Sequence, residues 1–258
     1  MKIIVLMKQV ANKDAVLRIG KDEKWIDESN IAHQTNESDG YGLEEALRLK
    51  ETKGEGEVIV CTLGGQSART VIKDALARGA DRAIHVVVEA DNKLSPHQIA
   101  KLIADAIRDE NAELIFTGLQ SDDASYGQTG VILAELLGIP HATIVIELDR
   151  ESLNGNLRVK RELESGWYQW FTYQLPALLT IQSGISQIRY ASLKGIMAAK
   201  KKEIKEITPT IEDFGAAQQI QKVYMPLKTK QTQMLGDGDA RKGAIELIEK
   251  LKTEVRVL

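Results

Sequence analysis

Short apolar runs of strand length alternate with longer amphipathic runs through the first 150 residues, and this alternation restricts the fold more than any other feature. The runs expected to form strands are 3–7, 57–61, 82–87, 114–117 and 142–146. The runs expected to form helices are 39–51, 67–78, 95–108 and 128–137. Continuously apolar strands joined by helices indicate a parallel sheet that is covered on both faces. The sequence therefore predicts an α/β fold with a doubly wound, mostly parallel sheet of the Rossmann-like, nucleotide-binding kind.

The pattern changes near residue 150. Two runs, 157–163 and 167–174, are separated by Glu164–Gly166, which predicts a β-hairpin with the glycine in its turn. After the hairpin come an apolar run at 177–181, an irregular segment, a polar region at 208–237 and an amphipathic helix at 240–251. The last fifth has few large apolar residues before that helix, as in an extended arm that packs on another chain. We expect a nucleotide-binding core at 1–150, a hairpin and sheet extension at 151–205, and an arm with a helix at 206–258.

Composition excludes several classes of function. The chain has 258 residues with 34 Lys and Arg against 37 Asp and Glu, and a net charge of −3 argues against a nucleic-acid binder. Three Trp, six Tyr and three Phe leave little for stacking on bases. The single cysteine cannot form an internal disulfide. The apolar start at 3–7 is too short for a signal segment or for the roughly 20 residues of a membrane span, so we expect no membrane protein and a cytoplasmic location.

The loops that follow the strands are the places to look for a ligand, because ligands of open parallel sheets bind at the carboxyl ends of the strands. Two of these loops contain glycine and lead into a helix, 62–67 and 118–130. The N-terminus of a helix offers free N–H groups and a partial positive charge to a phosphate. A nucleotide phosphate at Gly127–Thr129 is one interpretation, and ordinary helix capping is the other. Neither loop carries a Walker A or G-x-G-x-x-G motif.

No catalytic constellation is apparent in the sequence. The four histidines, His33, His85, His97 and His141, lack the spacing of metal ligands, and there is no G-x-S-x-G segment. Cys61 ends an apolar strand and is expected to be a buried, inert thiol. Asp122 and Asp123 are adjacent and would point in different directions. The residues alone thus indicate a nucleotide-binding α/β protein with no chemistry of its own.

Several segments together resemble the beta subunit of electron transfer flavoprotein. The segments that carry the resemblance are 2–10, 36–51, 75–82, 118–130, 159–166 with 175–180, and 189–197. The most specific is Val159-Lys160-Arg161-Glu162-Leu163-Glu164-Ser165-Gly166, followed by the Leu175-Pro176-Ala177 run. The matches extend from residue 2 to about residue 205.

The resemblance implies a heterodimer in which a larger alpha subunit holds most of one redox-active FAD. The beta subunit would bind a structural AMP. Carried over to this sequence, the residues that would contact the AMP are Leu6, Asn36, Glu37, Ser38, Asp39, Leu63, Gly118, Gln120, Asp123, Gly127, Gln128 and Thr129. The segment at 206–258 would contact the alpha subunit.

The resemblance also implies a partner-recognition loop. Its residues here would be Tyr190, Leu193, Ile196 and Met197, with Leu193 at the tip as an apolar anchor. The anchor would enter an acyl-CoA dehydrogenase or a similar electron donor of fatty acid oxidation. Electrons would then pass to the membrane enzyme electron transfer flavoprotein–quinone oxidoreductase. The chain would be an electron-carrier subunit without independent turnover, not an enzyme.

Two features depart from the family's pattern. Glu37 follows Asn36 where many members have proline, and Gly127 stands where many have asparagine. Some relatives are electron-bifurcating and bind a second FAD in the AMP position with NAD(H) nearby, and this alternative stays open. A different class of protein, a stand-alone nucleotide-binding enzyme or AMP sensor, is the other alternative.

The segments at 167–173 and 200–202 are candidates for contacts with partner proteins. The run from Trp167 to Tyr173 contains five aromatic residues, and we expect one face of this strand to meet the alpha subunit. The three lysines at 200–202 form either a solvated face or a patch that steers an acidic partner.

Overall fold

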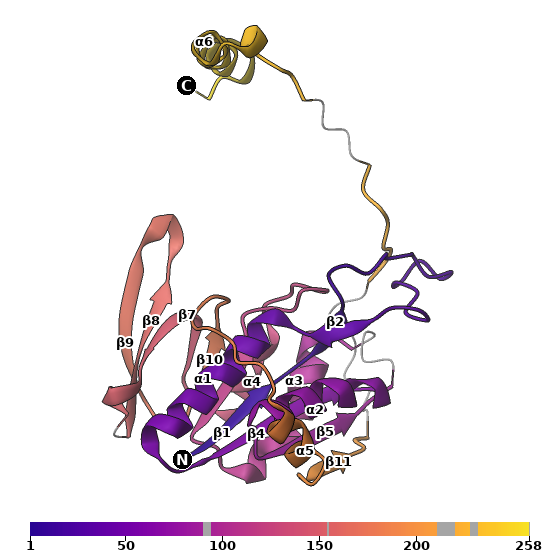
Figure 1. Ribbon diagram of the computed structural model, residues 1–258, viewed down its shortest axis with the longest axis vertical. Helices are drawn as coiled ribbons and strands as arrows, with labels where there is room; N and C mark the ends of the chain where they lie inside the picture. Colours follow the sequence, from indigo (N-terminus) through magenta and orange to yellow (C-terminus); the bar gives the residue numbers. More distant parts are fainter. Residues whose placement is uncertain (90–93, 154, 211–219, 228–231, 258) are drawn as a thin grey trace. The chain divides into compact units, whose positions relative to one another are not determined.

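A nine-stranded sheet is the centre of the larger part of the chain (Figure 1). The computed structural model describes residues 1–89, 94–153, 155–210, 220–227 and 232–257, which divide into two units, Met1–Val223 and Tyr224–Leu258. The order of the strands in the sheet is β11-β5-β4-β1-β6-β10-β7-β8-β9. All neighbouring strands are parallel except for the β7–β8 and β8–β9 pairs at one edge.

The bounds of the elements follow the sequence pattern closely. The strands of the sheet are β1 (Lys2–Leu6), β4 (Glu57–Gly64), β5 (Arg82–Val87), β6 (Leu114–Gly118), β7 (His141–Asp149), β8 (Asn156–Glu162), β9 (Tyr168–Gln174), β10 (Ala177–Ile181) and β11 (Ile204–Ile207). The helices of the first unit are α1 (Glu37–Lys53), α2 (Arg69–Arg78), α3 (Pro96–Ile107), α4 (Thr129–Leu137) and α5 (Leu193–Ala199). The prediction of a doubly wound, mostly parallel α/β sheet with a β-hairpin is confirmed.

Alternate residues of each central strand face opposite helical layers. Ile3 and Val5 of β1 belong to the hydrophobic cluster that includes apolar residues of α1 and α2. Ile4 and Leu6 belong to the cluster that includes apolar residues of α3 and α4. Since side chains alternate along a strand, a continuously apolar strand serves both layers at once. This arrangement brings the carboxyl ends of β1, β4 and β6 to one edge of the sheet, where the helices of both layers begin.

Local sequence signals set the helix starts that matter for this edge. The Ser95 hydroxyl accepts the N–H of Gln98, and the Gln98 side chain accepts the Ser95 N–H, which forms the capping box of α3. Pro96 occupies the first position of the helix, where its missing N–H is not needed. Ser95 is therefore the N-cap of α3.

The hairpin at one edge of the sheet has the expected turn. β8 and β9 pair in antiparallel register from Asn156 opposite Gln174 to Glu162 opposite Tyr168. Ser165 and Gly166 both have positive φ, at 58° and 78°. A glycine adopts this conformation without steric penalty, which is why the chain reverses at this point.

Three elements lie where the sequence predicts loops. β2 (Gln9–Ala11) and β3 (His33–Thr35) form a separate two-stranded sheet, and β11 extends the main sheet beside β5. The prediction that Leu193 lies at the tip of a loop is wrong, because Leu193 is the first residue of α5. The Ser192 hydroxyl accepts the Gly195 N–H at 3.0 Å and so caps this short helix.

The three lysines at 200–202 do not form one solvated face. Lys200 and Lys201 are exposed, but Lys202 is half-buried and donates to the carbonyl oxygen of Leu76 at 2.9 Å. It also donates to the carbonyl oxygen of Ala80, just beyond α2. An ammonium at the C-terminal end of a helix satisfies carbonyl groups that have no partner inside it.

The second unit contains α6 (Ala240–Lys250), continued by a π-helical turn at Leu251–Val255. The Asp239 carboxylate accepts the N–H groups of Arg241 and Lys242 at 2.8 and 3.2 Å and caps the helix. α6 has no buried residue, and its apolar side chains Ile245, Leu247 and Ile248 are exposed. The domain boundaries expected at residues 150 and 205 stay a prediction.

The central strand β10 gives a test of the packing. Leu179 is fully buried and pairs with Phe116 of β6 and Ala142 of β7. We expect Leu179→Ala to lower the free energy of unfolding by about 2–5 kcal/mol, because it removes buried apolar contacts and leaves a cavity. Leu193→Ala, at a side chain that is 84% exposed, should change it by less than about 0.5 kcal/mol. Urea denaturation of both variants measures the difference, and equal effects at the two positions would contradict the described burial.

Candidate functional site

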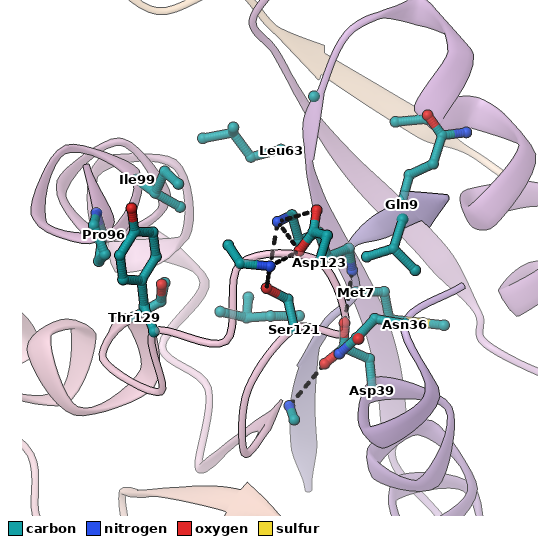
Figure 2. A pocket seen from close by; sticks show the side chains of 18 of the residues that line it. Met7, Gln9, Asn36, Asp39, Leu63, Pro96, Ile99, Ser121, Asp123 and Thr129 are labelled. Atoms are coloured by element: carbon teal, nitrogen blue, oxygen red, sulfur yellow. Dashed lines mark hydrogen bonds and ion pairs between the residues drawn. The ribbon is translucent and has the colours of Figure 1, made fainter. Parts of the chain in front are cut away.

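A pocket of about 290 Å³ lies at the carboxyl ends of β1, β4 and β6 (Figure 2). Its walls come from the loops after these strands and from the first turns of α1, α3 and α4. Figure 2 shows Leu63, Pro96 and Ile99 on its apolar side, and Asn36, Asp39 and Asp123 among its polar groups. This is the edge at which the sequence predicts a ligand.

The pocket collects most of the residues that the resemblance implies as nucleotide contacts. Those that line it are Leu6, Asn36, Asp39, Leu63, Gly118, Gln120, Asp123, Gly127, Gln128 and Thr129. Glu37 and Ser38 do not line it. The Glu37 carboxylate accepts a hydrogen bond from Lys13, and the Ser38 hydroxyl donates to the carbonyl oxygen of Gln120 at 3.0 Å. That any of the twelve residues contacts a nucleotide stays a prediction.

Asn36 precedes α1 and joins it to the loop that follows β6. Its side-chain amide donates to the carbonyl oxygen of Gln120 at 3.0 Å, and its side-chain oxygen accepts the N–H of Asp122 at 2.9 Å. Asn36 is at the N-cap position but accepts no backbone N–H of its own helix, and its side-chain amide also donates to the Ser38 hydroxyl at 3.1 Å. The Asn36 side chain thus binds the loop that follows β6 and does not cap α1.

Asp39 connects the ends of β1 and β6. Its two carboxylate oxygens accept the backbone N–H groups of Lys8 at 2.7 Å and of Gly118 at 2.9 Å. Its carboxyl is buried, and burial raises its pKa from 3.8 to about 6, although the hydrogen bonds it accepts oppose this shift. A Cβ on Gly118 would lie 2.1 Å from the Ser38 hydroxyl, so only glycine allows this approach.

The charged groups of the pocket are mostly acidic. Lys8 is the sole Lys or Arg among the described residues that line it, and the carboxylates are Glu28, Asp39, Glu89 and Asp123. The Lys8 ammonium lies 2.7 Å from the Asp123 carboxylate. Burial raises the pKa of Asp123, but the Lys8 ammonium and the hydrogen bonds from Ser121 and Ala124 together outweigh it, and the net pKa lies below the ordinary value. Asp123 is therefore an ionised acceptor at neutral pH.

Two of the helix starts that border the pocket, the one after the loop at 64–67 and the start of α4, differ in what lies against them. Beside the loop at 64–67, the Glu89 carboxylate accepts the Gln66 N–H at 3.4 Å, and a Cβ on Gly65 would lie 2.6 Å from it. The protein's own anion thus covers this loop. At the start of α4, Gly127 has a φ of 62° and leads into Gln128 and Thr129, all of which line the pocket. The first turn of a helix leaves its N–H groups without partners inside the helix, so an anion fits here.

The strand-and-loop pattern did not reveal one wall of the pocket. It comes from residues 9–33, with Trp25, Glu28 and His33, and from Ile220. The sequence predicts a helix that starts near Pro96. The loop at 12–32 carries no motif that would indicate a place at the pocket. Cys61 also lines the pocket, and burial raises the pKa of its thiol to about 12, in agreement with an inert side chain. The described residues contain no group of His, Cys, Asp and Glu side chains that could hold a metal ion.

Comparison with known proteins shows the family to which the chain belongs. The model of the electron transfer flavoprotein domain matches residues 24–212, well over half of the chain. The beta subunit of electron transfer flavoprotein from Methylophilus methylotrophus is 35% identical over 245 residues, which cover 92% of this chain and 93% of that protein. The chain belongs to the electron transfer flavoprotein beta-subunit family.

Other members of the family match over long stretches. The beta subunit from Bradyrhizobium diazoefficiens is 35% identical over 258 residues and covers 100% of both chains. The human beta subunit is 34% identical over 212 residues, which cover 81% of this chain and 82% of that protein. An electron-transfer role accompanies this membership. Within the described residues, no helix combines the length and the apolar character that a membrane crossing needs.

The residues that the resemblance implies for partner recognition lie together on and before α5, and this role stays a prediction. Tyr190, Leu193 and Met197 are 94, 84 and 62% exposed, and Ile196 is 44% exposed. Arg189 ties this segment to α1, because its guanidinium bonds to the carboxylates of Glu44, at 2.9 Å from Nε, and of Glu51. These bonds, with Glu51 the stronger partner, raise the pKa of the Arg189 guanidinium. The exposed apolar side chains of this segment therefore lie next to a residue, Arg189, that is bonded to α1.

The pKa of Asp39 gives a pH-dependent expectation. Because this pKa is about 6 in the fold and near 3.8 in the unfolded chain, the folded chain binds more protons between these values. The contribution of Asp39 to stability is thus full below about pH 4 and is lost as the pH rises through about 6. The free energy of unfolding of the parent minus that of Asp39→Asn should fall by about 2–3 kcal/mol over this range. Urea titrations between pH 4 and pH 7 measure it, and a difference that rises with pH would contradict the assignment.

Proposed function

We propose that the chain is the beta subunit of a heterodimeric electron transfer flavoprotein and holds an AMP in the pocket beyond β1, β4 and β6. The observation that carries the proposal is the convergence of Leu6, Asn36, Asp39, Leu63, Gly118, Gln120, Asp123 and Gly127–Thr129 on one pocket. Of the two glycine-containing helix starts there, the one at α4 is open to an anion, and a single lysine lies nearby among the described lining residues. Such a site suits a ligand with one phosphate group.

The residues of the pocket have distinct proposed roles. Backbone N–H groups at Gly127–Thr129 and the Thr129 hydroxyl bind the phosphate. Asp123, held ionised by Lys8, accepts hydrogen bonds from ribose hydroxyls. The apolar side, with Leu6, Leu63 and Cys61, contacts the base. Asn36 and Asp39 act through the loops that they hold.

The redox-active FAD is proposed to lie mainly in the alpha subunit. In that arrangement this chain is an electron carrier without independent turnover. Two groups of exposed apolar side chains suit a contact with the alpha subunit. On the hairpin they are Trp167, Tyr168 and Trp170, and in the second unit they are Tyr224, Met225, Leu227, Met234, Ile245, Leu247, Ile248, Val255 and Val257.

The surface of Tyr190, Leu193, Ile196 and Met197 is proposed to bind the electron donor, an acyl-CoA dehydrogenase or a similar flavoenzyme. Exposed apolar side chains on a fixed helix are the usual anchors of such contacts. The acceptor is proposed to be electron transfer flavoprotein–quinone oxidoreductase. The cytoplasmic location stays a prediction, because a relative from Arabidopsis thaliana, 35% identical over 260 residues, is mitochondrial.

Nucleotide extraction tests the cofactor assignment. We expect acid treatment of the purified heterodimer to release one FAD and one AMP. Thr129→Val should weaken AMP binding about tenfold, because it removes a hydrogen bond to a charged group. Thr172→Val, at an exposed position of β9, is the control and should leave AMP binding unchanged. Two FAD per heterodimer would support the bifurcating alternative, and the absence of any nucleotide from the beta chain would contradict the proposal.

Substitution of Leu193 tests the donor surface. We expect Leu193→Ala to lower the rate of flavin reduction by an acyl-CoA dehydrogenase about tenfold at limiting donor, because an anchor side chain is lost. Flavin and AMP contents should not change. Val16→Ala, at an apolar residue that is 81% exposed outside this surface, should leave the rate unchanged. Equal rates for the Leu193 variant and the parent would refute this role.

A further inference from the structure

The wall of the pocket that comes from residues 9–33 and Ile220 contains the aromatic side chain of Trp25. Trp25 lines the pocket and is half-buried. Its indole N–H donates to the Glu28 carboxylate at 2.7 Å, which satisfies its one polar group. The surface that the indole offers to a ligand is therefore apolar and aromatic.

The loop that carries Trp25 has a defined conformation. β2 and β3 close its base, and the isolated bridge between Ile19 and Ile26 closes a smaller hairpin inside it. The N–H of Gly20 donates to the carbonyl oxygen of Trp25 at 2.8 Å. A Cβ on Gly20 would lie 2.9 Å from that oxygen, so the turn depends on glycine. These contacts fix the backbone from which the indole extends.

The tip of the same loop is held by the segment at 220–223. The N–H of Val223 donates to the carbonyl oxygen of Glu23 at 2.8 Å, and Lys222 forms an ion pair with Glu23 at 2.8 Å. The Lys24 ammonium donates to the carbonyl oxygen of Gln221. Ile220, next to these contacts, also lines the pocket. The loop and this segment thus form one wall together.

Charge distinguishes this wall from the start of α4. Glu28 lies beside Trp25, and Glu89 covers the other helix start. A phosphate placed at either carboxylate would meet like charge, whereas the N–H groups at Gly127–Thr129 attract it. The uncharged part of a nucleotide is therefore the part that the wall at Trp25 can accept. Tyr126, the other large aromatic residue of the lining, directly precedes the phosphate end.

We infer that Trp25 contacts the planar base of the nucleotide and determines how tightly the base is held. The inference rests on the proposed function, since it assumes that the phosphate binds at α4. An aromatic side chain can stack on the flat face of any base, and loss of such a contact weakens binding by about tenfold. Trp25 is thus a positioning contact for the base, separate from the groups that bind the phosphate.

Binding measurements on the heterodimer, stripped of nucleotide, test the role of Trp25. We expect Trp25→Ala to weaken AMP binding about tenfold and Trp25→Phe to weaken it less than threefold, because phenylalanine retains a ring. Binding of ribose 5-phosphate, which has no base, should be equal in the parent and in both variants. Val16→Ala, at a residue of the same loop that is 81% exposed and does not line the pocket, is the matched control and should leave AMP binding unchanged.

Fluorine NMR gives a second readout that does not depend on affinity. The beta chain is labelled with 5-fluorotryptophan and combined with an unlabelled alpha subunit, and Trp25→Phe assigns the Trp25 signal. AMP should shift the Trp25 signal and leave those of Trp167 and Trp170 in place. An unmoved Trp25 signal in a complex that binds AMP, or Trp25→Ala affinity within twofold of the parent, would overturn the inference alone. Failure of the parent complex to bind AMP would overturn the proposed function with it.

Discussion

The buried carboxylate of Asp39 is the contact on which the pocket depends. It accepts one backbone N–H from the end of β1, at Lys8, and one from the end of β6, at Gly118. Neighbouring parallel strands are joined by hydrogen bonds only along their paired lengths, so the loops beyond them need another connection. Asp39 supplies it from the first turn of α1, and burial of the carboxyl is the accompanying energetic cost. The shape of the pocket therefore rests on one helix start.

The same helix also supports the surface proposed to bind the donor. Its first turn holds the pocket loops through Asn36 and Asp39, and its later turns present Glu44 and Glu51 to Arg189. Glu44 is nearly fully buried and pairs with both Arg48 and Arg189, so removal of Arg189 would leave this buried charge with one of its two partners. The two surfaces thus share a rigid element, although Asp39 and Arg189, which take part in these contacts, are about 150 positions apart in the sequence.

The sequence predicts the elements with strong periodicity and misses those defined by distant contacts. The continuously apolar runs predict the strands of the core, and Ser95 marks the start of α3. The tendency of ligands to bind at the carboxyl ends of parallel strands predicts the position of the pocket. α5 has only seven residues and no buried one, so its sequence has no clear helical stripe. The roles of Asn36 and Ser38 as links between loops depend on partners more than 80 residues away. The sequence does not predict that Trp25 lines the pocket, because no local pattern specifies the path of the loop that carries it.

The acidic lining of the pocket limits where a ligand can place its negative charges. Lys8 is engaged with Asp123, and Glu89 covers the helix start after the loop at 64–67, so the start of α4 is the place where the proposed phosphate would meet free N–H groups. A second phosphate elsewhere along the lining would lie near Glu28 or Glu89 and would be repelled in a medium of reduced dielectric constant. A mononucleotide avoids this repulsion because its charge is confined to one end. The distribution of carboxylates, more than the number of donors, therefore favours AMP over a dinucleotide at this site.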